Sequence, residues 1–325
     1  LRQSAKEHPA VFAAASLCIS RMTNTLTAFS RWHLTRENLE GIFSRQAIGM
    51  VWDFCEGNPL SESTGSLEGA IEWVSATAEA WSVKGLLGQV ERADCAAVPL
   101  ADEAASIWFT DPPYYDSVPY AHLSDVFYVW LKRAIGARLP SLFQTSLTPK
   151  DDECVVDRPH SASDSKKTPQ YYEAKMASAM AEGRRVLRND GIGCVVFAHK
   201  STEGWEALLA GIRDAGWVLT ASWPIVTEMA TRNNARDTAS LAASVHLVCR
   251  PRPEDAPVGD WAEVLGELPR RVGDWMERLQ TEGVRGADLV FACVGPALEI
   301  FSRYPKVETA EGREVRLPEF LNQDA

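Results

Sequence analysis

Residues 106–114 read Ser-Ile-Trp-Phe-Thr-Asp-Pro-Pro-Tyr, an apolar strand-like run that ends in an acid, two prolines and an aromatic residue. Pro112 and Pro113 fix their backbone φ angles and carry no N–H, so the carbonyl groups of this corner are held in place. Open α/β sheets bind ligands at the carboxyl ends of their strands. The stretch therefore predicts a sheet with a binding corner at that edge, and the alternative is a strand followed by a proline-rich turn.

Strand and helix patterns alternate on both sides of this run. Strands are expected at 89–94 (a weak signal), 106–110, 193–198, 217–223 and 243–249, and helices at 122–138, 168–187 and 201–215. Such alternation predicts a doubly wound α/β sheet. The segments 217–223 and 243–249 are expected to pair as a hairpin across a long connection, and 189–191 reads as a turn.

The flanking regions read as helical. Helices are expected at 5–31, from Thr35 through Phe54, from Ser66 through Trp81, and at 261–279 and 287–301, with Ser66 and Thr168 as N-caps. The chain is thus predicted to divide into a helical region (1–87), an α/β core (88–250) and a C-terminal helical extension (251–325).

Composition describes an ordinary globular protein without a membrane span. The 325 residues are 46% hydrophobic and 24% charged, and no apolar run is long enough to cross a bilayer. Seven cysteines are scattered singly, without a Cys-x-x-Cys pair, which argues against a disulfide framework and against a zinc site. We therefore expect no metal and a cytoplasmic location.

The net charge of −11 argues against a typical nucleic-acid binder, because phosphate contacts usually require a basic surface. Contact with DNA would need a local basic region. Basic residues gather in two polar segments, 144–167 and the stretch before residue 243, and the candidates for phosphate contacts are Lys150, Arg158, Lys166, Lys167, Arg232 and Arg236. The alternative for each of them is a solvated surface loop.

The corner suits chemistry on a planar exocyclic amine. The carboxylate of Asp111 and the carbonyl of Pro112 are both acceptors for an NH2 group, while the ring of Tyr114 is placed to stack on the base that carries it. Adenine N6 and cytosine N4 satisfy these acceptors equally well. Hydrogen bonds from the amine to these two acceptors would favour a tetrahedral nitrogen and free its lone pair for direct attack on a methyl donor, so neither a covalent intermediate nor a nucleophilic side chain is required.

Asp111-Pro112-Pro113-Tyr114 resembles motif IV of the amino-methyltransferases, which act on adenine N6 or cytosine N4. The wider stretch from Asp111 to Arg133 is similar to the corresponding region of large prokaryotic adenine-specific DNA methylases with an embedded zinc ribbon. Residues 45–54, Asn58-Pro59 and 295–298 are also similar to that family, so the resemblance covers most of the chain.

The resemblance implies a Rossmann-like methyltransferase sheet, here its later strands with an antiparallel last strand, and S-adenosylmethionine as cofactor. It also implies that Tyr115, Asp116 and Tyr120 shape the base pocket and that Asp94 contacts the adenine of the cofactor. For Asp94 the alternative is an ordinary turn residue. His199, after the strand 193–198, is a candidate for the wall of the pocket.

One feature of the family is missing. Methyltransferases of this class have a Gly-rich turn after the first strand, and residues 1–325 contain none in that context. The chain is therefore expected to be the C-terminal half of a methylase that works with a missing N-terminal half or a partner chain. Two alternatives stay open: a protein-glutamine N-methyltransferase, which usually has Asn in place of Asp111, and a non-catalytic scaffold subunit.

Overall fold

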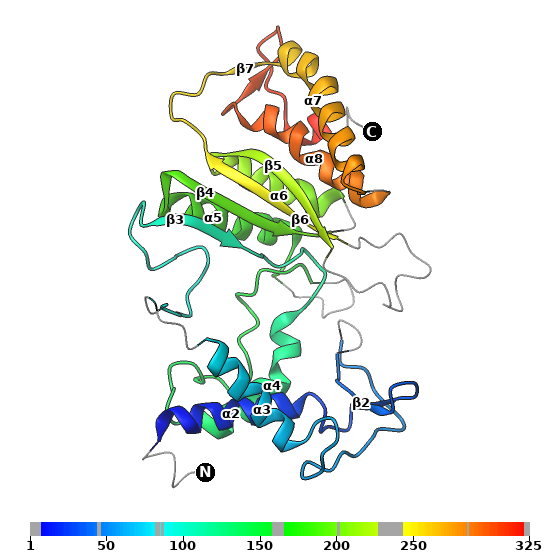
Figure 1. The fold of residues 1–325 in the computed structure, drawn as a ribbon. Coiled ribbons are helices and arrows are strands. Elements are labelled where there is room, and N and C mark those ends of the chain that lie inside the picture. The colour runs from blue at the N-terminus through cyan, green and yellow to red at the C-terminus, as the bar shows by residue number, and fades with distance from the viewer. Residues whose placement is uncertain are drawn as a thin grey trace. The chain divides into compact units, whose positions relative to one another are not determined.

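The computed structural model describes residues 8–43, 47–81, 85, 88–157, 166–199, 202–226, 243–284 and 286–321. The chain forms mixed α/β structure and divides into two compact units (Figure 1). The helical unit comprises Leu1–Val90 and Val118–Glu153, and the sheet unit comprises Glu91–Ser117 and Cys154–Ala325. The predicted boundaries at 87 and 250 differ from this division, since residues 118–153 fold with the N-terminal region.

In the helical unit, α2 (Pro9–Thr23) packs against α3 (Leu67–Ala80) and α4 (Tyr120–Ile135). The predicted start of α3 is confirmed, because the Ser66 hydroxyl accepts a hydrogen bond from the Gly69 amide at 3.2 Å. The helix expected at 5–31 is shorter than predicted and ends at Thr23.

The helix predicted from Thr35 through Phe54 is wrong. The short strands β1 (Arg31–His33) and β2 (Asn38–Glu40) form an antiparallel pair instead. Glu37 has a φ of 50° in the turn, and an Arg31–Glu40 ion pair of 2.5 Å joins the two strands. These cross-strand contacts stabilise a hairpin that the sequence periodicity does not reveal.

The sheet unit contains a four-stranded sheet in the order β3-β4-β6-β5. Its strands are β3 (Ala105–Thr110), β4 (Leu187–Phe197), β5 (Trp217–Val226) and β6 (Ala243–Pro251). β3 and β4 are parallel, whereas β6 runs antiparallel to both β4 and β5, which confirms the predicted hairpin. The weak strand expected at 89–94 is absent, because these residues have no regular structure.

Two helices, α5 (Pro169–Val186) and α6 (Thr202–Asp214), lie on one face of the sheet (Figure 1). As predicted, the Thr168 hydroxyl caps α5 by accepting a hydrogen bond from the Tyr171 amide. The core between these helices and the sheet is fully buried and includes Tyr172, Met176, Val195, Phe197, Leu208, Trp217 and Leu247.

The turn predicted at 189–191 is wrong, because these residues lie within β4. The ladder between β3 and β4 shifts register here: Ala105 pairs with Leu187, and Ile107 pairs with Ile192. A Cβ at Gly191 would lie 2.9 Å from the Ser106 carbonyl and 2.7 Å from Leu187. Glycine thus marks a bulge in the strand where the neighbouring backbone approaches closely.

Within the sheet unit, the C-terminal region packs on the sheet along β5. α8 (Ala287–Ser302) contacts β5 and α7 (Trp261–Thr281), and both helices lie close to their predicted positions. The short strands β7 (Gly259–Asp260) and β8 (Val307–Glu308) pair in parallel, and α9 (Leu317–Leu321) follows. The Ser222 hydroxyl on β5 donates a hydrogen bond to the Ala292 carbonyl, so α8 is fixed to the edge of the sheet.

Candidate functional site

The carboxyl ends of β3 and β4 bring two of the predicted segments together. The strands are parallel neighbours, with Thr110 paired to Val195, so Asp111 and His199 both follow a strand at the same edge of the sheet. The predicted position of the corner is therefore confirmed: it lies at the edge where ligands of α/β sheets bind.

Within the corner, the two predicted acceptors differ in exposure. Asp111 is exposed, and its Oδ1 accepts a hydrogen bond of 2.6 Å from the Tyr114 hydroxyl. In the described part of the chain, no hydrogen bond is made to Asp111 Oδ2 or to the carbonyl of the buried Pro112. An NH2 group has two donors, which matches a free carboxylate oxygen beside a fixed carbonyl.

Tyr172 on α5 supports the corner through a hydrogen bond. Its hydroxyl donates a hydrogen bond of 2.8 Å to the Pro113 carbonyl, and the side chain is fully buried. Burial strongly raises the pKa of Tyr172, so the phenol stays neutral and remains a donor. The sequence contains no signal for this role of Tyr172, because only the packing of α5 against the sheet brings it to the corner.

The Tyr114 ring is half-buried and packs edge-on against Phe197, with ring centroids 5.3 Å apart. Phe197 ends β4 and in turn packs edge-on against Trp205 on α6 at 5.0 Å. Tyr114 is thus held between Asp111 and the aromatic core. Its expected role of stacking on a base is not tested by this arrangement and remains a prediction.

Tyr115 and Asp116 form the outer part of the corner. Tyr115 has a φ of 53°, in the left-handed region that bulky residues rarely adopt, and its ring packs against Tyr172 at 5.1 Å. Asp116 Oδ1 lies 3.2 Å from His199 Nε2. The structure therefore joins Tyr115 and Asp116 to His199, which the sequence indicated only as a candidate for the wall of the pocket.

The electrostatic environment of the corner is negative. Burial raises the pKa of Tyr115, and the nearby carboxylates of Glu173, Glu203 and Asp116 raise it further. The three carboxylates disfavour any further negative charge near Tyr115. The corner therefore suits a neutral or positively charged group, such as an amine, better than a phosphate.

Tyr120 is the first residue of α4 and belongs to the helical unit, whereas Asp111–Asp116 belong to the sheet unit. Its hydrogen bonds within the helical unit include one from the Ser124 hydroxyl to its carbonyl. Its expected role in the base pocket therefore stays a prediction.

Asp94, the predicted cofactor contact, does not end a strand. Its Oδ1 accepts a hydrogen bond from the Ala96 amide at 2.9 Å, and its Oδ2 pairs with Lys175 on α5 at 2.5 Å. The hydrogen bond from Lys175 is the main reason that the pKa of Asp94 is lowered. This geometry is that of the alternative, a turn aspartate, here one that also fastens its loop to a helix.

The predicted basic contacts are scattered. Lys150, in the helical unit, pairs with Asp125 at 2.9 Å, Lys166 is exposed, and Lys167 is buried at 7% exposure, unlike a residue of a solvated loop, the alternative to a phosphate contact. The backbone of Lys167 is held by a hydrogen bond that its carbonyl accepts from the Asp157 amide. Arg158, Arg232 and Arg236 lie outside the described residues.

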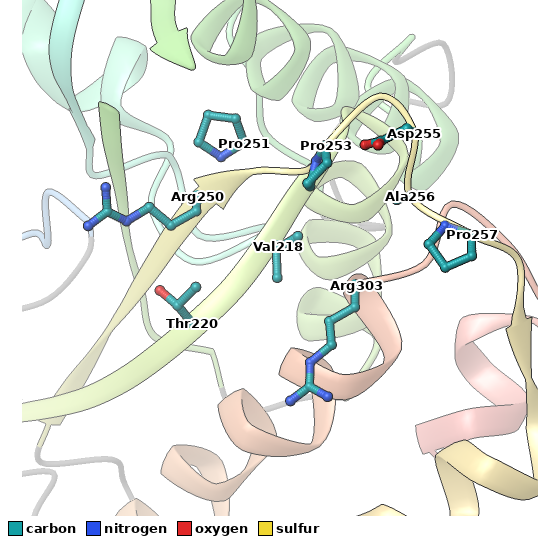
Figure 2. A pocket seen from close by; sticks show the side chains of 9 residues that line it. All are labelled: Val218, Thr220, Arg250, Pro251, Pro253, Asp255, Ala256, Pro257 and Arg303. Carbon is teal, nitrogen blue, oxygen red and sulfur yellow. The ribbon is translucent and has the colours of Figure 1, made fainter. Parts of the chain in front are cut away.

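A shallow groove lies at the opposite end of the sheet (Figure 2). It is lined by Val218 and Thr220 of β5, Arg250 and Pro251 of β6, the loop at 253–257 and Arg303. β5 is parallel to β4, so its first residues lie at the amino edge, away from Asp111. Arg303 is already paired with Glu267 and Glu299, both at 3.0 Å.

No group of three or more potential metal ligands occurs among the described residues, and none of the seven cysteines forms a disulfide. None of the helices that the structure describes combines the length and the apolar composition that a membrane crossing requires. No known protein-family model matches the chain, and a search of curated proteins gave no match.

Proposed function

We propose that the chain supplies the target-base pocket for S-adenosylmethionine-dependent methylation of an exocyclic amine in DNA, with adenine N6 as the preferred target. One observation carries the proposal: among the described residues, nothing donates a hydrogen bond to Asp111 Oδ2 or to the carbonyl of Pro112, its neighbour in the chain, at the carboxyl end of β3. Cytosine N4 fits the same acceptors. The preference for adenine comes from the family resemblance of residues 111–133.

The topology supports a Rossmann-like methyltransferase sheet. β3 and β4 supply parallel strands, and the antiparallel last strand β6 is inserted between β4 and β5. An antiparallel last strand is what the resemblance implies for the later part of that sheet. β3 is an edge strand of the sheet within the described residues.

The two features expected to bind the cofactor do not support a cofactor site within this chain. No Gly-rich turn follows a strand in the sequence, and Asp94 is engaged by Lys175. The contribution of this chain is therefore on the acceptor side. It binds the amine, accepts hydrogen bonds from it at Asp111 and at the Pro112 carbonyl, and holds the base beside Tyr114. A missing N-terminal half or a partner chain would provide the cofactor site.

DNA as the partner and a cytoplasmic location are part of the same proposal. A base in a duplex must be flipped out before its amine can reach such a corner. The negative corner would receive the uncharged base, while phosphate contacts would have to come from basic residues elsewhere. Seven cysteines without a disulfide support a reducing compartment.

The test is methyl transfer from isotopically labelled S-adenosylmethionine to DNA. The assay uses this chain and the longest open reading frame that contains it. Asp111→Ala is expected to reduce transfer about 100-fold or more, because it removes a preorganised acceptor at the reacting nitrogen. Asp190→Ala is the matched control: this exposed aspartate on β4 pairs only with Arg188 among the described side chains.

Equal activity of Asp111→Ala and the wild type would contradict the proposal. DNA in which every adenine is already N6-methylated separates the two bases: loss of transfer identifies adenine, and full transfer identifies cytosine.

A further inference from the structure

We infer that His199 is the positioning residue of the corner: its imidazole holds the Tyr115–Asp116 turn and thereby sets where Asp111 and the Pro112 carbonyl point. The role depends on the proposed amine-binding function. It would fix the corner after β3 to the residues that follow β4. Nothing in the motif itself indicates it, because His199 lies 88 residues after Asp111 in the chain.

His199 is fixed in place by α6 and β4. It lies two residues after Phe197, the end of β4, and only 9% of it is exposed. Its backbone carbonyl accepts a hydrogen bond of 2.9 Å from the indole Nε1 of Trp205. A Cβ at Gly204 would lie 2.5 Å from its Nδ1, so α6 can approach the ring this closely only because residue 204 is glycine.

The imidazole reaches the corner through two contacts. Its Nε2 lies 3.2 Å from Asp116 Oδ1, and its ring packs edge-on against Tyr115 with centroids 5.5 Å apart. Tyr115 is the residue with a φ of 53°. A bulky residue keeps such a conformation only where its surroundings hold it, and strained residues of this kind gather at functional sites.

The same turn is linked directly to the acceptors. The Tyr115 amide donates a hydrogen bond of 3.2 Å to the Pro113 carbonyl, the carbonyl that Tyr172 also binds. The Tyr115 carbonyl accepts a hydrogen bond of 3.0 Å from the Val156 amide. Movement of Tyr115 would therefore move Pro113, and the two prolines transmit that movement to Asp111 because their φ angles are fixed.

Three variants separate the possible roles of the side chain. His199→Phe keeps a flat ring but removes the hydrogen bond to Asp116, and His199→Gln restores a nitrogen donor near the position of Nε2. Gly204→Ala leaves His199 unchanged but displaces its ring. His122→Phe, at an exposed histidine on α4, is the control for the loss of an imidazole.

The first measurement is amide hydrogen exchange of residues 111–117 in the full chain. His199→Phe and Gly204→Ala are expected to speed exchange about tenfold or more in this segment, with little change in the core of β6. His199→Gln and His122→Phe should match the wild type. Unchanged exchange in both His199→Phe and Gly204→Ala would overturn the positioning role, and Gly204→Ala keeps the test valid if His199→Phe fails to fold.

The second measurement is binding of 2′-deoxyadenosine and of purine 2′-deoxyriboside, which lacks the amine, by NMR titration. The wild type is expected to prefer deoxyadenosine about fivefold or more, since the two acceptors are satisfied only by an amine. His199→Phe should lose this preference while binding purine deoxyriboside as before, and His199→Gln should recover it.

The two measurements fail independently. If exchange responds to the variants but neither deoxyadenosine nor 2′-deoxycytidine is preferred over purine deoxyriboside by the wild type, the proposed amine function is wrong and the positioning of the turn stands. If the preference is present but survives in His199→Phe and Gly204→Ala, the proposed function stands and the role of His199 is wrong.

Discussion

The two faces of the central sheet are built from alternate residues of the same strands, yet they differ sharply in burial. On the face toward α5 and α6, Trp217 and Leu247 are 1% and 0% exposed. On the other face, Ile107 and Phe109 of β3 are 68% and 62% exposed. These two side chains are therefore largely uncovered among the described residues.

This difference identifies the side of β3 that the described residues leave uncovered. Sheets with parallel strands are normally covered on both faces, and their strands then carry apolar residues on both. β3 has that composition but only one covered face, and it is also an edge strand in the described sheet. The open face is consistent with the proposal that another half of the enzyme, or a partner chain, packs beside β3.

The largest expected effect comes from the covered face. Leu247→Ala should lower the free energy of unfolding by about 2–5 kcal/mol, because it leaves a cavity among fully buried side chains. Phe109→Ala, on the open face, should lower it by less than about 1 kcal/mol, as surface substitutions do. Urea unfolding of both variants measures the difference, and similar losses would show that Phe109 is covered in solution.

A smaller effect is expected where α5 meets β3. A Cβ at Gly183 would overlap the indole of Trp108, which stacks on Trp217 with centroids 5.2 Å apart. Gly183→Ala should therefore destabilise the protein by about 1–3 kcal/mol through overpacking.

The matched control for that substitution is Gly273→Ala in α7, where an added methyl meets no atom within 4 Å. It should stabilise the protein by about 0.5–1 kcal/mol, because alanine favours the helix. Thermal unfolding followed by circular dichroism distinguishes the two signs. A stabilising Gly183→Ala would contradict the close contact between α5 and β3.

The smallest effect concerns the loop that Asp94 fastens to the outside of α5. The Lys175–Asp94 pair lowers the pKa of Asp94 from 3.8 and raises that of Lys175 from 10.5. Its contribution is therefore present between these ordinary values. It is lost as the pH falls through the lowered pKa of Asp94 or rises through the raised pKa of Lys175.

Lys175→Met should accordingly cost less than about 1 kcal/mol at pH 7, since the pair is partly exposed, and less than that at about pH 2. Urea unfolding at the two pH values measures this, with Arg188→Met, which breaks an exposed pair on β4, as the control. A loss that does not depend on pH would mean that Lys175 acts through packing rather than charge.

Much of the sheet unit could be predicted because its signals are local. The cap at Thr168, the apolar run before Asp111 and the apolar strand before His199 each depend on a few neighbouring residues, as does the cap at Ser66 in the helical unit. The hairpin at 31–40 and the bulge at Gly191 could not, because an ion pair and a neighbouring strand decide them. Local propensity carries no information about such contacts.

The sequence by itself determined that residues 106–114 form a strand ending in a rigid acceptor corner, because proline geometry and apolar patterning act within a few residues. Only the tertiary structure decided what surrounds that corner. It brings Tyr172 to Pro113 and His199 to Asp116, and it leaves Tyr120 in the other unit and Asp94 on Lys175. Those contacts join residues from different elements, and only the packing of strands and helices brings such residues together.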